Sequence, residues 1–369
     1  PLSLSKLLEE GTLAEQFVLL GWKVNLRLLS LSLPRDKFLA WSQDIAAIIK
    51  AKKTTFQALD SVVGRLNHAA TPLTLARYFM NRIRRAAHRN ESEDRQKTNK
   101  KIKWLGKSVL ADFQLFLDYF LPKLHEGISL NLLTFRRPTH IFWSDACPSG
   151  MGGFSHHSGK AWRFEIPSEF LQAVNKLNNL LEFIASVISV WIEILDGAPP
   201  QSCFLSFADN TSAVGWLHKA NVNETSNKHL ETATRHFATL LIQANCCLYS
   251  QHFKGSENKV ADALSRRFDL SDNQLEFFIH STLHHQVPST FKLAPLPQSI
   301  SSWVIWLLQR IKETTASQKV QETKKQECGN AGSNTVESSK TTTMSTYSDS
   351  HLPFEQQCSE HLPQPCDAD

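Results

Sequence analysis

The sequence lacks the features that mark a secreted or a membrane protein. Its seven cysteines include no Cys-x-x-Cys pair, which argues against a disulfide framework and against a cysteine-rich zinc site. No uninterrupted apolar run reaches about 18 residues, so the sequence offers no transmembrane candidate. Residues 1–3 contain neither a methionine nor a signal-peptide pattern and look like a cut from a longer polypeptide. We therefore expect no membrane partner and an intracellular location, the cytoplasm or the nucleus.

The composition is that of a folded chain with a sizeable core. Of the 369 residues, 41% are hydrophobic, and they include 22 Phe and 9 Trp. This length allows two or three domains. The formal net charge is only +5, so the whole-chain charge does not by itself indicate a nucleic-acid partner.

Four carboxylates lie in apolar surroundings, where a charge is costly. They are Asp145, which ends the strand-like run 139–144; Glu182, in the apolar, helix-like run 180–195; Asp209, which ends the strand-like run 203–208; and Asp262, in the run 257–266, which follows a third strand-like run, 246–253. Carboxylates in such settings are usually paired, hydrogen-bonded or bound to a metal. Four of them in one domain suggest a shared solution.

The order of these segments predicts that the four carboxylates converge. Asp145 and Asp209 both follow a strand, and ligand sites in α/β sheets form outside the carboxyl ends of the strands. Hard divalent cations take oxygen ligands, and two of them about 3.5–4 Å apart can clamp a scissile phosphodiester. The residues therefore predict metal-assisted phosphodiester hydrolysis.

Each carboxylate taken alone has a second interpretation. Asp145 could close an Asx turn, and Glu182 could be half of a buried ion pair. Asp209 with Asn210 could begin a helix as an N-cap, and Asp262 could be a solvated helix residue. The catalytic interpretation depends on the four occurring together and in this order.

Four sequence blocks carry a resemblance to a known family. They are Ser144-Asp145-Ala146, Leu181-Glu182-Phe183, Ala208-Asp209-Asn210 and Gly255-Ser256-Glu257-Asn258-Lys259-Val260-Ala261-Asp262-Ala263-Leu264-Ser265-Arg266. Their order resembles the ribonuclease H domain of retrotransposon reverse transcriptases. A weaker resemblance, in residues 286–313, is to tyrosine-recombinase retrotransposons of the DIRS group.

The resemblance implies a fold, a site and a substrate. The fold would be α/β, a ribonuclease H-like five-stranded mixed sheet flanked by helices, preceded by a small, mostly helical thumb and connection region. Asp145, Glu182, Asp209 and Asp262 would hold two Mg²⁺ or Mn²⁺ ions. The activity would be endonucleolytic hydrolysis of the RNA strand of an RNA:DNA hybrid, and the rest of a reverse transcriptase polyprotein would be a partner.

The resemblance, together with composition, divides the chain into segments. We expect a palm-end, primer-grip-like hairpin in 1–33, thumb-like helices in 34–104, a connection in 105–137, the ribonuclease H-like domain in 138–268, an extension in 269–313 and a disordered tail in 314–369. No two aspartates are adjacent anywhere, so the paired aspartates of a polymerase palm are absent. We therefore expect that this chain does not polymerise by itself.

A basic run provides candidate substrate contacts. Residues 82–107 contain ten Lys or Arg residues against three acidic ones, a balance of +7 that exceeds the net charge of the chain. A charge run usually marks a solvated helix face, but beside a candidate nuclease a phosphate-tracking surface is favoured. The candidates from this run are Arg82, Arg84, Arg85, Arg89, Lys100, Lys101 and Lys103, and Asn210 is a further candidate, for contact with 2′-hydroxyls.

Two other functions remain open on the sequence. The chain could be a non-catalytic scaffold that binds a hybrid or a partner. In that case the four carboxylates are present but no nucleic acid is cleaved. It could also be a nuclease or integrase of the same fold that acts on DNA.

Overall fold

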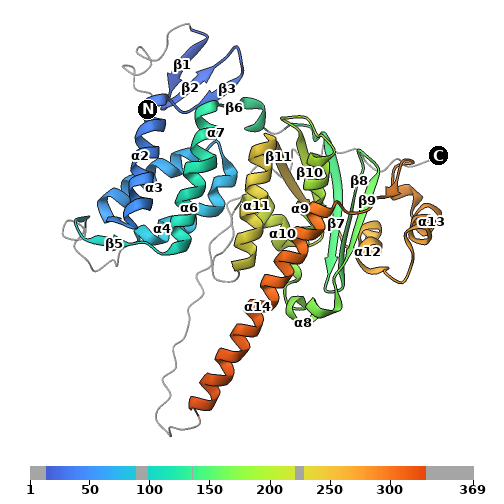
Figure 1. Cartoon of the computed structure of the whole chain (residues 1–369). Coiled ribbons are helices and arrows are strands. Elements are labelled where there is room, and N and C mark those ends of the chain that lie inside the picture. Colours follow the sequence, from blue (N-terminus) through green and yellow to red (C-terminus); the bar gives the residue numbers. More distant parts are fainter. Residues whose placement is uncertain (1–13, 89–98, 135, 221–227, 330–369) are drawn as a thin grey trace. The chain divides into compact units, whose positions relative to one another are not determined.

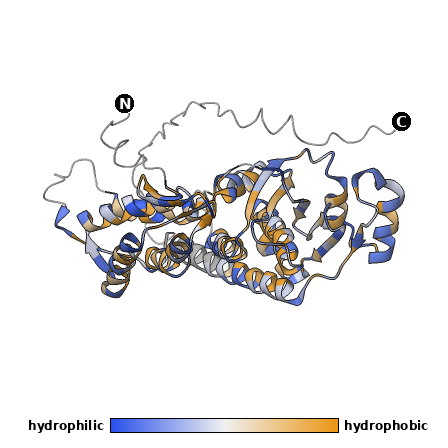
Figure 2. Cartoon of the chain, turned by 90° about the horizontal axis from the view of Figure 1, so that it is seen from above, coloured by the Kyte–Doolittle hydropathy of each residue, from blue (hydrophilic) through white to orange (hydrophobic). Residues whose placement is uncertain are grey.

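The computed structural model describes residues 14–88, 99–134, 136–220 and 228–329, with side chains as far as residue 317 (Figure 1). The chain divides into two units, Pro1–Gln318 and Lys319–Asp369. The first unit combines helices with a six-stranded mixed sheet, a mixed α/β architecture. In Figure 2 the helical ribbons alternate between hydrophobic and hydrophilic residues, as expected for helices that bury one face.

The N-terminal region contains a β-hairpin. Strands β1 (Gln16–Leu19) and β2 (Trp22–Asn25) pair antiparallel around Gly21, whose φ of 84° favours glycine. Strands β3 (Ser30–Ser32) and β6 (Ile128–Ser129) complete a four-stranded sheet.

Helices fill most of residues 35–126. Their bounds are α2 Arg35–Ala51, α3 Phe56–Ala69, the short η1 Thr74–Ala76, α4 Arg77–Ala87, α6 Lys107–Leu115, the π-helical η2 Phe116–Phe120 and α7 Leu121–Glu126, with η3 Leu130–Leu132 following β6. Helix α3 begins after Thr55, whose hydroxyl caps it by accepting a hydrogen bond from the Ala58 N–H. Strand β4 (Lys53–Thr55) pairs with β5 (Ile102–Trp104), so the two ends of the α3–α4 segment are joined.

The central sheet has six strands, one more than expected. Its order is β11 (Cys247–His252), β10 (Cys203–Ala208), β7 (His140–Cys147), β8 (Gly150–Ser155), β9 (Lys160–Glu165) and β12 (Lys292–Leu293). Strand β10 runs parallel to both β7 and β11, and β7, β8 and β9 are antiparallel neighbours. The extra strand comes from the C-terminal extension, which lies parallel to β9.

Two helices pack on opposite faces of β7 and β8. Helix α9 (Asn178–Leu195) and helix α12 (Lys259–Arg266) both contact these strands. A Cβ on Gly152 would lie 2.5 Å from that of Leu264 in α12, whereas one on Gly153 would lie 2.9 Å from the Ser189 hydroxyl in α9. Successive strand residues face opposite sides, so one glycine-rich strand lets both helices approach closely.

Helix α9 is the buried core helix that its sequence predicts. Among the described helices it is long and apolar enough to cross a membrane, a candidate that the sequence analysis did not recognise, but 72% of that span is buried inside the molecule. The sequence offers Asn178 or Asn179 as its N-cap, but Leu177 occupies that position and makes no side-chain hydrogen bond. Helices α10 (Thr211–Lys219) and α11 (Lys228–Ala244) pack against α9.

The C-terminal extension consists largely of regular elements. It contains α13 (Asp272–Thr282), η5 (His284–Gln286), β12 and the start of α14 (Gln298–Gly329). Residues 314–329, assigned to the disordered tail, therefore lie in a helix. The rest of that tail, 330–369, lies outside the described residues.

Replacing Gly152 should destabilise the fold. In the Gly152→Ala variant the new methyl group meets Leu264 and the backbone of α12, so the free energy of unfolding should fall by about 1–3 kcal/mol. Urea denaturation measures it. Gly64→Ala is the control, because a Cβ there meets nothing within 4 Å and alanine favours the helix by about 1 kcal/mol. Equal stability of the two variants would contradict close packing of α12 on β8.

Candidate metal centre

The parallel register of β7 and β10 brings two carboxylates to the same edge of the sheet. Phe207 pairs with Trp143, and two residues further along each strand direction stand Asp209 and Asp145. Asp209 follows the last residue of β10 and is partly exposed. Its carboxylate lies against Gly255, where a Cβ would be 2.5 Å from Asp209 Oδ2. A side chain at residue 255 would therefore displace this aspartate.

Asp145 is buried and held by α12. It is 3% exposed, and its Oδ2 accepts a hydrogen bond of 2.5 Å from the Ser265 hydroxyl. The same hydroxyl also lies 3.0 Å from the Asp262 carbonyl, so α12 fixes its direction. Burial raises the pKa of Asp145 to about 6, and the neighbouring Asp209 and Asp262 add to the rise, against the Ser265 hydrogen bond.

Glu182 enters the same site from α9. It is 3% exposed and accepts a hydrogen bond from the Ala146 N–H. Its Oε2 is buried without a hydrogen-bond partner. Burial first, and then the charges of Asp145 and Asp209, raise the pKa of Glu182 to about 9. At neutral pH and without a cation, this carboxyl therefore retains its proton.

These three side chains form a group that could hold a metal ion. Oxygen atoms of Asp145, Glu182 and Asp209 all lie within 4.8 Å of one another. No other group of three His, Cys, Asp or Glu residues among those the structure describes is as close. The donor set is all oxygen, and the unpaired Glu182 Oε2 leaves a ligand atom available. The residues therefore fit a hard divalent cation.

Asp262 stands at the margin of this group. Its side chain is 51% exposed, and its Oδ1 accepts a hydrogen bond from Arg266 Nε one turn along α12. It is close enough to contribute to the raised pKa of Asp145. The structure thus brings three of the four predicted carboxylates together and leaves the fourth in an ion pair beside them.

Asn210 has a structural role in addition to any contact with substrate. Its Oδ1 accepts hydrogen bonds of 3.0 Å from the Ser212 and Ala213 N–H groups, which makes it the N-cap of α10. Its Nδ2 donates to Asn179 Oδ1 at 2.8 Å, which ties the start of α10 to the start of α9. Asn210 therefore provides the N-cap that the sequence left open, while Asp209 beside it belongs to the carboxylate group.

Arg82, one of the candidate substrate contacts, is ion-paired with two carboxylates. Its guanidinium donates hydrogen bonds of 2.7 and 2.9 Å to Asp112, which is fully buried, and forms an ion pair with Glu231. Arg235 also binds Asp112, at 2.8 Å. Arg82 thus joins α4, α6 and α11. The sequence could not show this, because Asp112 and Glu231 lie far along the chain.

The remaining members of the run differ in their surroundings. Arg84 and Arg85 are exposed on α4, Lys100 and Lys101 are exposed before β5, and Lys103 Nζ lies over the Phe56 ring at 5.6 Å. Arg89 lies outside the described residues. Sequence reasoning missed Ser265 as the partner of Asp145, although it lies within the resembling block 255–266.

Arg82→Gln should destabilise the protein rather than weaken substrate contacts directly. Removing one member of a buried ion network leaves charge uncompensated, so we expect a loss on the order of 3 kcal/mol in the free energy of unfolding. Arg84→Gln, on the same helix, is the control and should stay within about 0.5 kcal/mol of the wild type. Chemical denaturation of both variants measures the free energy of unfolding. If Arg82→Gln left that free energy unchanged, the ion network would not be needed for folding.

Without a cation, stability should fall as the pH rises. The pKa of Glu182 moves from 4.5 to about 9 on folding, so between these pH values the native state holds a proton that the unfolded chain has released. In EDTA, Glu182→Gln should therefore be more stable than the wild type at pH 8, by at least about 1.4 kcal/mol, and the gain should shrink toward pH 4.5.

Glu193→Gln is the matched control for this effect. Glu193 lies on the same helix and is equally buried, at 3%, but it accepts a hydrogen bond from the Ser158 hydroxyl. Its replacement should not stabilise the protein. A pH-independent effect of Glu182→Gln would contradict the raised pKa.

Comparison with known proteins gives limited further information. No protein family's sequence profile matches the chain, and no curated protein matches it. Among solved structures, a foamy viral protease-reverse transcriptase dRH in complex with ds DNA is similar at 14% identity and a TM-score of 0.23. The match covers 65% of this chain and 38% of that one.

Proposed function

We propose that this chain is a metal-dependent nuclease that hydrolyses the RNA strand of RNA:DNA hybrids endonucleolytically, as part of a retroelement reverse transcriptase. The observation that carries the proposal is the cluster of Asp145, Glu182 and Asp209, with Glu182 Oε2 buried and unpaired. The choice of an RNA strand rests on the resemblance of the sequence blocks around these residues.

The cluster has the chemistry for phosphodiester hydrolysis. Its three carboxylates would hold Mg²⁺ or Mn²⁺, and a pair of such ions would supply Lewis-acid activation of water and of the phosphoryl oxygens. Asp262 would join the set when its carboxylate leaves Arg266. The Ser265 hydroxyl and the Ala146 N–H orient Asp145 and Glu182, and the loss of such supporting contacts typically costs 10- to 100-fold in metal affinity.

Burial explains why a cation would be bound favourably at this position. Three carboxylates so close together, two of them 3% exposed, cannot all ionise cheaply, as the raised pKa values of Asp145 and Glu182 show. A divalent cation replaces the retained proton with a larger positive charge. The same cation would attract the negatively charged phosphodiester.

A cleavage assay with labelled duplexes tests the proposal. The wild type with Mg²⁺ should cut the RNA:DNA hybrid and leave RNA:RNA and DNA:DNA intact. Asp145→Asn, Glu182→Gln and Asp209→Asn should each reduce the rate by at least about 100-fold, because each removes a predicted metal ligand. Asp262→Asn should reduce the cleavage rate less, because that carboxylate is exposed and paired with Arg266.

Asp269→Asn is the control, since this exposed aspartate pairs with Arg267 outside the cluster and its replacement should leave the rate unchanged. Hybrid binding without cleavage would favour the scaffold. Cut DNA would favour a DNA-acting nuclease or integrase.

A further inference from the structure

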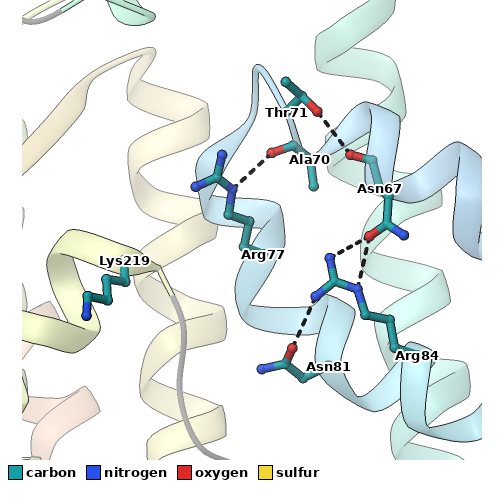
Figure 3. A pocket seen from close by; sticks show the side chains of 7 residues that line it. All are labelled: Asn67, Ala70, Thr71, Arg77, Asn81, Arg84 and Lys219. Carbon is teal, nitrogen blue, oxygen red and sulfur yellow. Dashed lines mark hydrogen bonds between the residues drawn. The ribbon is translucent and has the colours of Figure 1, made fainter. Parts of the chain in front are cut away.

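A basic pocket lies between the N-terminal helices and α10, away from the acidic cluster. Its cavity of about 450 Å³ is lined by Asn67, Ala70, Thr71, Arg77, Asn81, Arg84 and Lys219. Figure 3 shows the two arginines on α4 and Lys219 across from them on α10, with its ammonium turned away. Three of the seven residues are cationic, and no described residue of the lining is acidic.

The two arginines are held by neutral acceptors. Arg84 donates from Nε and Nη2 to Asn67 Oδ1, the former over 3.0 Å, and Arg77 Nε donates to the Ala70 carbonyl over 3.4 Å. Because these partners are neutral, the guanidinium groups are positioned while their charge is kept. Arg82, on the same helix, is instead paired with carboxylates.

The spacing along α4 points both arginines into the same cavity. Arg77, Asn81 and Arg84 are separated by four and three residues, so they lie along one face of the helix. The opposite wall is tied to this one, because the Tyr78 hydroxyl donates to the Trp216 carbonyl of α10 over 2.7 Å. The pocket is therefore built on two connected helices.

We propose that this pocket binds a phosphate of the nucleic-acid backbone, at a second point on the duplex whose other part reaches the acidic cluster. The identity of this duplex rests on the proposed function. Planar, multiply donating guanidinium groups suit a phosphate oxygen pair, and Lys219 adds a flexible point charge. The Asn67 and Thr71 side chains complete a polar lining.

Helix α10 sets the spacing between the two sites. Asn210 caps its start beside Asp209, and Lys219 ends it. Its nine residues span about 13 Å, which corresponds to roughly four base pairs along a duplex axis. The phosphate held in the pocket should therefore lie about four or more base pairs from the cleaved bond.

Hybrid binding in EDTA separates this contact from catalysis. A labelled RNA:DNA hybrid should bind the Arg77→Gln/Arg84→Gln variant at least about tenfold more weakly than the wild type, and the slope of log affinity against log salt should be smaller by about 1. The control is Arg35→Gln/Lys50→Gln, which removes two exposed cations of α2 and so has the same change in charge. Lys219→Gln provides a second, independently placed variant.

A scan with single methylphosphonate linkages locates the phosphate. One neutral linkage, about four or more base pairs from the cut, should weaken wild-type binding and have no effect on the arginine variant. Inorganic phosphate should compete with the hybrid for the wild type more strongly than for the variant.

The phosphate-binding proposal would be overturned if the arginine variant and the control variant bound the hybrid with equal affinity. It would also be overturned if no single methylphosphonate linkage weakened binding. If the hybrid is bound in this way but never cut, the nuclease proposal fails and the phosphate site stands.

Discussion

Three carboxylates whose oxygens lie within 4.8 Å of one another repel, and the fold must hold them together against that repulsion. Strand register places Asp145 and Asp209 level with each other, and α9 brings Glu182 to them from a helix buried in the core. The cost appears in the pKa values of Asp145 and Glu182, which are raised to about 6 and about 9. A site that keeps a proton at neutral pH is electrostatically prepared to exchange it for a cation.

Close backbone packing makes this arrangement possible. Gly152 lets α12 approach β8, and the approach places the Ser265 hydroxyl on Asp145 and the Asp262 carboxylate nearby. Gly153, facing the other way, leaves room for the Ser189 hydroxyl of α9. The glycine-rich strand thus determines the position of both helices that contribute carboxylates.

The local sequence predicted the main strands and helices. Contacts with residues far along the chain determined the features that it did not predict. The sequence indicated the cluster through the strand-like runs ending at Asp145 and Asp209 and the apolar run around Glu182. A carboxylate next to or within an apolar run is expected to be buried, and a buried carboxylate needs a partner. Asn178 and Asn179 are good N-cap residues by type, yet neither caps α9, and the Asn179 side chain instead accepts a hydrogen bond from Asn210 of a distant segment. Likewise, β12 has only two residues and exists through its pairing with β9, so its sequence carries little strand signal of its own.

The basic run shows why charge alone does not identify a binding surface. Arg82 and Arg84 are two residues apart on α4, yet Arg82 turns inward to the buried Asp112 while Arg84 meets only amide oxygens. Arg82 connects α4 with α11 through Glu231 and thereby supports the helix that also carries Arg84. A cation that is fixed but not neutralised remains attractive to a phosphate, whereas a neutralised cation stabilises the fold. Pairing, and not position in the run, separates these two roles.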